Sequence, residues 1–355
     1  MRVAIVGGGV MGCTTALSLA AAGAQVTLLE RAVPGAEASS AAAGILGAQA
    51  ELHRHAADLA PFIAARGAWE GWARELRELT GIDVGHRVSG VLRVASDEAG
   101  RAELVEEVAW QTAHGLRASL LDGDAARRVE PELSPEVVAA AHFPEDAQVD
   151  PPALLRALMA AAARSPRVTV RAGTTVERLV VENGRCLGVQ LDSARFASDA
   201  VVLAAGSWSS LVPGVPSDLP AVRPVRGQIV LLDERPPRTR AIVFGGGTYV
   251  VPRGDGRVLC GSTMEHAGFR KEVTAHGVHA ILSGALGCVP SLGAAQFAGA
   301  WSNFRPHAAG DRPLVGASPL PGLFLATGHH RNGILLSKVT ADAVARAVVA
   351  GPATG

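Results

Sequence analysis

The sequence has few lysines, few aromatic residues and no excess of charge of either sign. Lys+Arg and Asp+Glu number 33 each, aromatic residues make up 4% of the chain, and Tyr249 is its single tyrosine. Lys271 and Lys338 are its only lysines. A protein without excess positive charge lacks the electrostatic basis for binding nucleic acid or an anionic membrane surface. We therefore expect neither of these partners.

Cysteine is also scarce. The four cysteines are far apart in the sequence: Cys13, Cys186, Cys260 and Cys288. None belongs to a C-x-x-C pair or has a histidine at zinc-finger spacing, which excludes the common zinc modules. We expect buried, reduced thiols and a cytoplasmic protein. His53 and His55 have no nearby residues to complete a metal site, so no metal is expected.

A long hydrophobic run is missing as well. Residues 3–29 follow Arg2 without a charge, but five glycines and several polar residues interrupt them. A secretory signal or a membrane span needs a continuous apolar core, so neither is expected. At 355 residues, 48% of them hydrophobic, the chain is long enough for two domains or one large α/β unit.

The first thirty residues carry the strongest local pattern. A short apolar strand, Val3–Val6, leads into Gly7, Gly9 and Gly12 in the spacing G-x-G-x-x-G. A helical pattern over 14–22 and a second apolar strand over 26–29 follow, and Glu30 ends that strand. This order of elements is typical of a unit that binds a dinucleotide.

Each part of this unit has a physical role. Gly7 allows the tight turn, Gly9 lets the backbone approach a pyrophosphate, and Gly12 lets the helix pack closely on the strand. The free N–H groups at the start of the helix favour phosphate. The carboxylate of Glu30 can accept both hydrogens of a ribose diol. At this point NAD and FAD fit equally well.

Periodicity and turn residues predict the remaining elements. Helices are expected over 62–80, 97–114, 124–130, 152–163 and 333–350. Strands are expected over 88–95, 168–170, 175–181, 189–191, 199–205, 228–232, 249–252, 257–260 and 324–326. Residues 36–50 form either a helix start capped by Ser39 or Ser40 or a loop that admits a flat ligand. Strand–glycine–helix units at both ends enclose a sheet-rich insert. This predicts an α/β fold, in which a Rossmann-type domain built from discontinuous segments joins a mostly antiparallel-sheet domain.

Six blocks along the chain make a more specific pattern. They are LLERAVPGAEASSAAAGILGAQAE (Leu28–Glu51), VVLAAGSWS (Val201–Ser209), YVVPR (Tyr249–Arg253), GSTM (Gly261–Met264), FRP (Phe304–Pro306) and ATGHHRNGILLS (Ala326–Ser337). In this order they resemble the D-amino acid oxidase family of FAD-dependent flavoproteins. Within that family they are most similar to the glycine oxidases associated with thiamine biosynthesis.

The resemblance implies a cofactor and a division of the chain. Residues 1–82, 145–215 and 306–355 would form the FAD-binding domain, and 83–144 and 216–305 the substrate-binding domain. FAD would be bound non-covalently. The residues expected to bind it are Gly7, Gly9, Val10, Met11, Gly12, Glu30, Arg31, Ser39, Ser40, Ala43, Gly44, Ile45, Leu46, Val176, Ala205, Gly206, Trp208, Gly328, His330, Arg331, Asn332, Gly333 and Ile334.

The resemblance also implies the reaction. Glycine, sarcosine or a small D-amino acid would lose a hydride from its α carbon to flavin N5. The imine would hydrolyse to the 2-oxo acid, and O2 would reoxidise the flavin to give H2O2. No acid–base side chain is expected, only positioning. The residues expected to bind substrate are Tyr249, Arg305, Arg331, Met264 and His330. A homodimer or homotetramer would suit the family.

Two positions depart from the family pattern, and several alternatives stay open. Gly247 replaces a histidine two residues before Tyr249, and His330 replaces an apolar aromatic residue. A dehydrogenase of D-amino acids or hydroxyproline that reduces a quinone is one alternative. A non-catalytic flavoprotein subunit and an NAD dehydrogenase are others. Without the family match, Arg305 could form a surface ion pair and Tyr249 could be a core residue.

Overall fold

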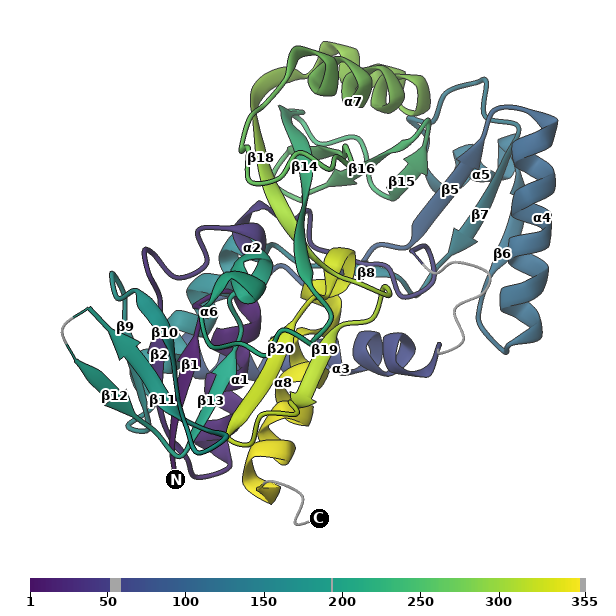
Figure 1. Cartoon of the computed structure of the whole chain (residues 1–355). Helices are drawn as coiled ribbons and strands as arrows, with labels where there is room; N and C mark the ends of the chain where they lie inside the picture. Colours follow the sequence, from purple (N-terminus) through teal and green to yellow (C-terminus); the bar gives the residue numbers. More distant parts are fainter. Residues whose placement is uncertain (52–58, 193, 352–355) are drawn as a thin grey trace.

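The structure is a computed structural model that describes residues 1–51, 59–192 and 194–351. Figure 1 shows two large sheets, with the parallel sheet and its helices at lower left and the other sheet beneath α7 and beside α4. Strands β14 and β18 run from one region toward the other. The predicted α/β class is confirmed.

The parallel sheet has six strands in the order β19-β20-β13-β1-β2-β9, and β19 alone runs antiparallel to its neighbour. Its strands are β1 (Arg2–Val6), β2 (Gln25–Leu29), β9 (Val168–Arg171), β13 (Ala200–Leu203), β19 (Leu314–Ala317) and β20 (Leu323–Thr327). Side chains of a strand alternate between faces, so both faces of a buried strand must be apolar. Val3 and Ile5 pack toward the helices, and Ala4 and Val6 pack toward the opposite face.

Four helices pack together on one face of this sheet: α1 (Val10–Ala21), α3 (Ala60–Thr80), α6 (Pro151–Arg164) and α8 (Gly333–Ala350). The other face is covered by a three-stranded sheet, β10 (Val176–Glu182), β11 (Arg185–Leu191) and β12 (Arg195–Ala197). The hairpin between β10 and β11 turns at Asn183 and Gly184, both with positive φ. Positive φ at both central residues is what an Asn-Gly hairpin signal predicts.

The larger sheet has eight strands in the order β18-β14-β17-β16-β15-β5-β7-β6, antiparallel except where β15 meets β5. Its strands are β5 (Val91–Ala95), β6 (Ser119–Asp122), β7 (Ala139–Phe143), β14 (Val222–Asp233), β15 (Ile242–Gly245), β16 (Thr248–Pro252), β17 (Arg257–Gly261) and β18 (Gln296–Ala308). Helix α7 (Ala275–Cys288) packs on one face and α4 (Glu98–Ala113) on the other. Helix α5 (Gly123–Val129) packs beside β6 and β7.

A small three-stranded sheet completes the fold. It consists of β3 (Ile45–Leu46), β8 (Ala147–Gln148) and β4 (Arg87–Val88). Strand β3 follows the short helix α2 (Ala38–Ala41) in the chain. The small-residue segment after Glu30 therefore leads directly into this sheet. The strands of the parallel sheet fall in the segments expected for the FAD-binding domain, while β18 crosses the expected boundary at residue 305. The exact division into domains stays a prediction.

The elements expected from the sequence differ from the structure in three ways. Residues 88–95 are not one strand, because Ser89 and Gly90 separate β4 from β5, and these strands join different sheets. Ser39 and Ser40 do not cap α2 but lie within it. No element was expected at β15, β18 or α7. Glycines interrupt the hydrophobic pattern of β18 and α7, and β15 has only four residues. Packing against neighbouring elements stabilises all three.

The four cysteines are buried and free, as expected. Burial raises the pKa of Cys13 and Cys260 to about 12, so these thiols stay protonated and unreactive at neutral pH. Among the described residues, no helix is both long and apolar enough to span a bilayer.

Candidate functional site

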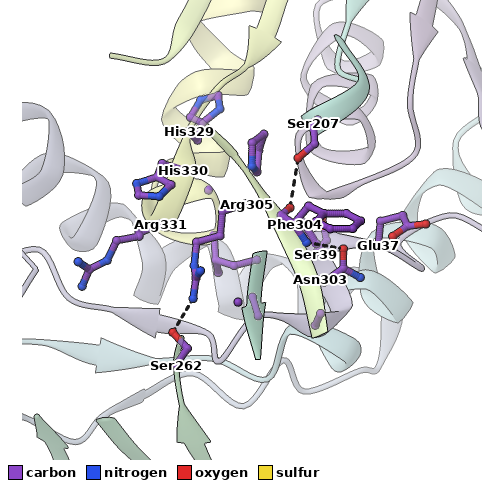
Figure 2. A pocket seen from close by; sticks show the side chains of 18 of the residues that line it. Glu37, Ser39, Ser207, Ser262, Asn303, Phe304, Arg305, His329, His330 and Arg331 are labelled. Atoms are coloured by element: carbon purple, nitrogen blue, oxygen red, sulfur yellow. Dashed lines mark hydrogen bonds between the residues drawn. The ribbon is translucent and has the colours of Figure 1, made fainter. Parts of the chain in front are cut away.

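A cavity of about 1130 Å³ is lined by residues of both large sheets. It extends from the glycine loop after β1 to the ends of β16 and β18. Its volume exceeds the roughly 300–1,000 Å³ typical of a small-molecule pocket. Figure 2 shows Arg305, His330 and Arg331 in one part of its wall and Ser39, Glu37 and Ser207 in another. The cavity has room for a ligand larger than a typical metabolite.

The glycine loop forms one end of the cavity. Gly7 has a φ of +107°, which only glycine adopts without strain. A Cβ on Gly12 would lie 1.9 Å from the carbonyl oxygen of Gly7, so no side chain fits between α1 and β1. The Glu30 carboxylate lies beside this loop, where it accepts hydrogen bonds from the backbone N–H groups of Gly8 (2.8 Å) and Ala32 (3.0 Å).

The N-termini of two helices reach the same cavity. Helix α1 begins after Gly9 and helix α8 after Asn332, and neither has a side-chain cap or an acidic residue in its first turn. Ser39 accepts a hydrogen bond from the N–H of Val10 at 2.9 Å. The remaining free N–H groups and the positive end of each helix dipole favour negative charge at both places.

Arg305 and Tyr249 form the opposite end. Arg305, on β18, donates to the Ser262 hydroxyl and to the Thr263 carbonyl oxygen (3.1 Å), and Tyr249 lies on β16 beside Phe244. Burial lowers the pKa of Arg305, and burial raises the pKa of Tyr249. Arg305 remains charged at neutral pH because a guanidinium titrates only in strong base, and Tyr249 remains a neutral hydrogen-bond donor.

Glycines on the neighbouring strands make space for these two side chains. A Cβ on Gly227, on β14, would lie 2.4 Å from both terminal nitrogens of Arg305. A Cβ on Gly261, on β17, would lie 2.6 Å from the hydroxyl of Tyr249. The arginine and tyrosine therefore lie flat over the sheet, with their polar ends at the cavity.

Four arginines line the cavity, and their partners distinguish them. Three of them form ion pairs with a carboxylate. These pairs are Arg31 with Glu37 (3.6 Å), Arg93 with Glu107 (2.7 Å) and Arg331 with Glu51 (2.8 Å). Arg305 has only neutral hydrogen-bond partners among the described residues. A partly buried guanidinium without a carboxylate is expected to attract an anionic ligand group.

The structure brings most of the predicted site residues to this cavity. All five predicted substrate residues line it, although the side chain of Met264 is 56% exposed. The predicted cofactor residues that do not line it are Gly12, Ser40, Leu46, Gly328 and Asn332. The role of each residue stays a prediction. Glu51 was not among the site residues expected from the sequence, although it ends the small-residue block and pairs with Arg331 in the cavity wall.

No metal site is expected, and the described residues contain no group of three or more His, Cys, Asp and Glu side chains that could hold a metal. His53 and His55 lie outside the described residues.

The sequence matches the family described as FAD dependent oxidoreductase over residues 2–347. The chain belongs to this family. It is 35% identical to the glycine oxidase of Geobacillus kaustophilus, over 97% of this chain and 91% of the relative. It is 34% identical to the bifunctional protein ThiO/ThiG of Nostoc sp., over 98% of this chain and 52% of the relative, so it spans about half of that protein. The crystal structure of glycine oxidase from Bacillus cereus has a TM-score of 0.93 at 32% identity, covering 98% of this chain and 95% of that one.

FAD is the cofactor of this flavoprotein, and the residues present fit it. The glycine loop at Gly7 and Gly9 and the start of α1 line the cavity and suit a pyrophosphate, and Glu30 lines the same end, where it can bind an adenosine ribose. Gly333 and Ile334, at the uncapped start of α8, line the part of the cavity that also contains Arg305. Their N–H groups can stabilise negative charge on an isoalloxazine ring. Because the chain belongs to the FAD dependent oxidoreductase family, the NAD dehydrogenase alternative is excluded.

Two neighbouring histidines stay neutral in the folded protein. Burial lowers the pKa of His329 to about 3, and burial, followed by the charge of His307, lowers the pKa of His330 to about 4. His330 also has a positive φ of 49°, and no hydrogen-bond partner reaches its buried Nε2 among the described residues. In the unfolded chain these imidazoles bind protons below pH 6.5. Native stability is therefore lost as the pH falls from about 6.5 toward 4.

We expect His330→Asn to weaken this pH dependence. Asparagine tolerates the positive φ but cannot bind the proton. The melting temperature of the holoenzyme should fall less between pH 7 and pH 5 in the variant than in the wild type. Equal pH slopes for both proteins would show that the pKa of His330 is the same in the folded and the unfolded protein.

Proposed function

We propose that this flavoprotein oxidises a small amino acid, with glycine, sarcosine and small D-amino acids as the candidate substrates. The observation that carries the proposal is Arg305, which lacks a carboxylate partner among the described residues and lies beside Tyr249 in the cavity. The likeness to glycine oxidases over nearly the whole chain supports the same reaction. Among the candidates, glycine is therefore the first substrate to test.

In this proposal Arg305 and Tyr249 hold the substrate carboxylate. The fork of the guanidinium matches a carboxylate in two hydrogen bonds, and the phenol supplies a third donor. FAD, when bound, would supply the acceptor for the hydride of the α carbon and the route by which its electrons pass to O2 to give H2O2. The start of α8 stabilises the negative charge that this transfer creates.

No side chain is needed as a general base in this scheme. The substrate reacts with its amine neutral, and the protein contributes orientation and a preorganised electrostatic environment. His330 stays neutral above about pH 4, so it adds no positive charge beside Arg305 and Arg331 at neutral pH.

The proposal also covers the localisation of the enzyme, its oligomeric state and its pathway. We infer a cytoplasmic protein that forms a homodimer or homotetramer, because both would suit the family. A role in thiamine biosynthesis follows from the same likeness, since the relatives include proteins named ThiO/ThiG.

Anaerobic mixing tests the proposed reaction. The purified holoenzyme is mixed with glycine, sarcosine, D-alanine, D-proline and L-alanine, and flavin bleaching is followed by absorbance. We expect bleaching with glycine or another of the first four, and H2O2 after air is admitted. Bleaching without peroxide would favour the dehydrogenase that reduces a quinone. Absence of bleaching with every amine would contradict the proposal and favour a non-catalytic subunit.

Gly227→Ala tests the position of Arg305 without removing its charge. The new methyl group would displace the guanidinium, because it would lie 2.4 Å from both terminal nitrogens. A misplacement of about 1 Å can lower catalysis about 10²-fold, so we expect kcat/KM for glycine to fall by roughly 10–10²-fold.

Gly254→Ala is the matched control, because a Cβ there would meet nothing within 4 Å. FAD absorbance should be normal in both variants. Equal kcat/KM in Gly227→Ala and Gly254→Ala would show that the position of Arg305 does not matter for turnover.

A further inference from the structure

The substrate end of the cavity contains two arginines and also one carboxylate. Arg305 and Arg331 both line the cavity, but Glu51 lies with them. Nε and Nη2 of Arg331 donate to the same carboxylate oxygen of Glu51, at 3.2 and 2.8 Å. The charge of Glu51 raises the pKa of Arg331 more than any other cause does. Two guanidinium groups and one carboxylate leave this region with a net charge of about +1.

Glu51 is held in place by its own chain segment. The N–H groups of the two preceding residues, Gln49 and Ala50, donate to the buried carboxylate of Asp146, the latter at 2.8 Å. Asp146 in turn pairs with Arg66 on α3 at 2.8 Å. The side chain of Glu51 is only 9% exposed, so it is not a solvated surface carboxylate.

We propose that Glu51 determines the substrate specificity of this site, because it neutralises Arg331 and restricts the site to amines that carry a single carboxylate. This inference rests on the proposed amino acid oxidation. One carboxylate of the substrate pairs with Arg305 and balances the net charge. A second anionic group would lie beside Glu51, whose carboxylate repels it and cannot donate a hydrogen bond to it. The neighbouring Arg331 is already paired with Glu51 and does not compensate for this repulsion.

The proposal predicts what removal of the Glu51 charge does. In Glu51→Gln the region gains one positive charge, and the fork of Arg331 becomes available to a second carboxylate. Dicarboxylates should then bind better relative to monocarboxylates.

Binding of two small carboxylates to the holoenzyme tests this without turnover. Acetate and malonate are titrated into the protein, and the perturbation of the flavin absorbance gives each Kd. In the wild type we expect acetate to bind at least tenfold more tightly than malonate. In Glu51→Gln we expect the ratio of the two Kd values to shift at least tenfold toward malonate. Tighter binding of malonate by the wild type would overturn the proposal, and this measurement needs no variant.

Three variants separate the pairing from a general charge effect. Glu37→Gln removes a carboxylate elsewhere in the cavity wall, one that pairs with Arg31 and Lys271, and should leave the ratio unchanged. Glu51→Asp keeps the charge and should behave as the wild type. Glu51→Gln combined with Arg331→Met should return the ratio to its wild-type value. A shift of equal size in Glu37→Gln, or none in Glu51→Gln, would contradict the proposal.

Turnover kinetics test the role of Glu51 independently of the binding measurements. The ratio of kcat/KM for N-carboxymethylglycine to that for glycine should rise at least tenfold in Glu51→Gln. If no amine bleaches the wild-type flavin but the acetate and malonate preferences shift as expected, the proposed function fails and the role of Glu51 stands. If glycine is oxidised and the preferences do not shift, the proposed function stands and the proposed role of Glu51 fails.

Discussion

Replacing Arg305 by alanine is expected to lower kcat/KM for glycine by about 10²–10³-fold, or more, while FAD stays bound. Arg305 is the cavity-lining arginine that has no carboxylate partner among the described residues, so its charge is available to the substrate. Loss of one partner of a desolvated charge pair costs about 2–5 kcal/mol, or roughly 30- to 5,000-fold in kcat/KM, which brackets the expected loss. Steady-state kinetics and the flavin absorbance spectrum measure the two parts of the expectation.

Arg305→Lys provides the matched control. Lysine keeps the positive charge but lacks the fork, so we expect an intermediate loss of kcat/KM. Near-normal oxidation of glycine by Arg305→Ala would remove Arg305 from the substrate site and with it the basis of the proposed function. Loss of FAD from this variant would instead assign Arg305 to the stability of the cavity.

Gly12→Val is expected to abolish FAD binding. Any Cβ at this position would lie 1.9 Å from the carbonyl oxygen of Gly7 and 3.3 Å from the Leu28 side chain. Backbone cannot move aside as the end of a flexible side chain can, so α1 would be displaced from β1. The N–H groups at the start of α1 would then no longer face the pyrophosphate. Purified protein should be colourless, and added FAD should not raise its melting temperature.

Gly71→Ala is the corresponding control in a helix. Gly71 lies within α3, and a Cβ there would meet nothing within 4 Å. Alanine in a helix interior is more stable than glycine by roughly 0.5–1 kcal/mol, so this variant should bind FAD and unfold at a slightly higher temperature. If Gly12→Val were purified with its yellow colour, the role assigned to the glycine loop would be wrong.

Features that depend on neighbouring residues in the chain could be predicted from the sequence. Asp97 and Asp150 accept hydrogen bonds as N-caps of α4 and α6, and Gly81 ends α3 in a left-handed conformation. Helix α8 has the predicted bounds, Gly333–Ala350. Caps, breakers and periodicity act within a few residues, so one sequence contains the whole signal.

Elements that depend on distant partners could not be predicted. Strand β18 contains glycine and proline and lacks an alternating pattern, but it pairs with β14 along nearly its whole length. Helix α7 contains Gly277, Gly284 and Gly287, which weaken its helical pattern, and its buried Ile281 packs on the large sheet. Tertiary packing outweighs local propensity at these places.

The same division holds for the functional site. A dinucleotide-binding unit could be predicted from the sequence alone, because Gly7, Gly9 and Gly12 are required within one short turn and Glu30 follows the next strand. Which charges face one another became clear only from the fold. Arg331 and Glu51 are 280 residues apart, and their pairing leaves Arg305 as the arginine of this site that has neutral partners only within the described part of the chain. Electrostatic interactions depend on distance in space, so the charge that the substrate meets is set by the fold.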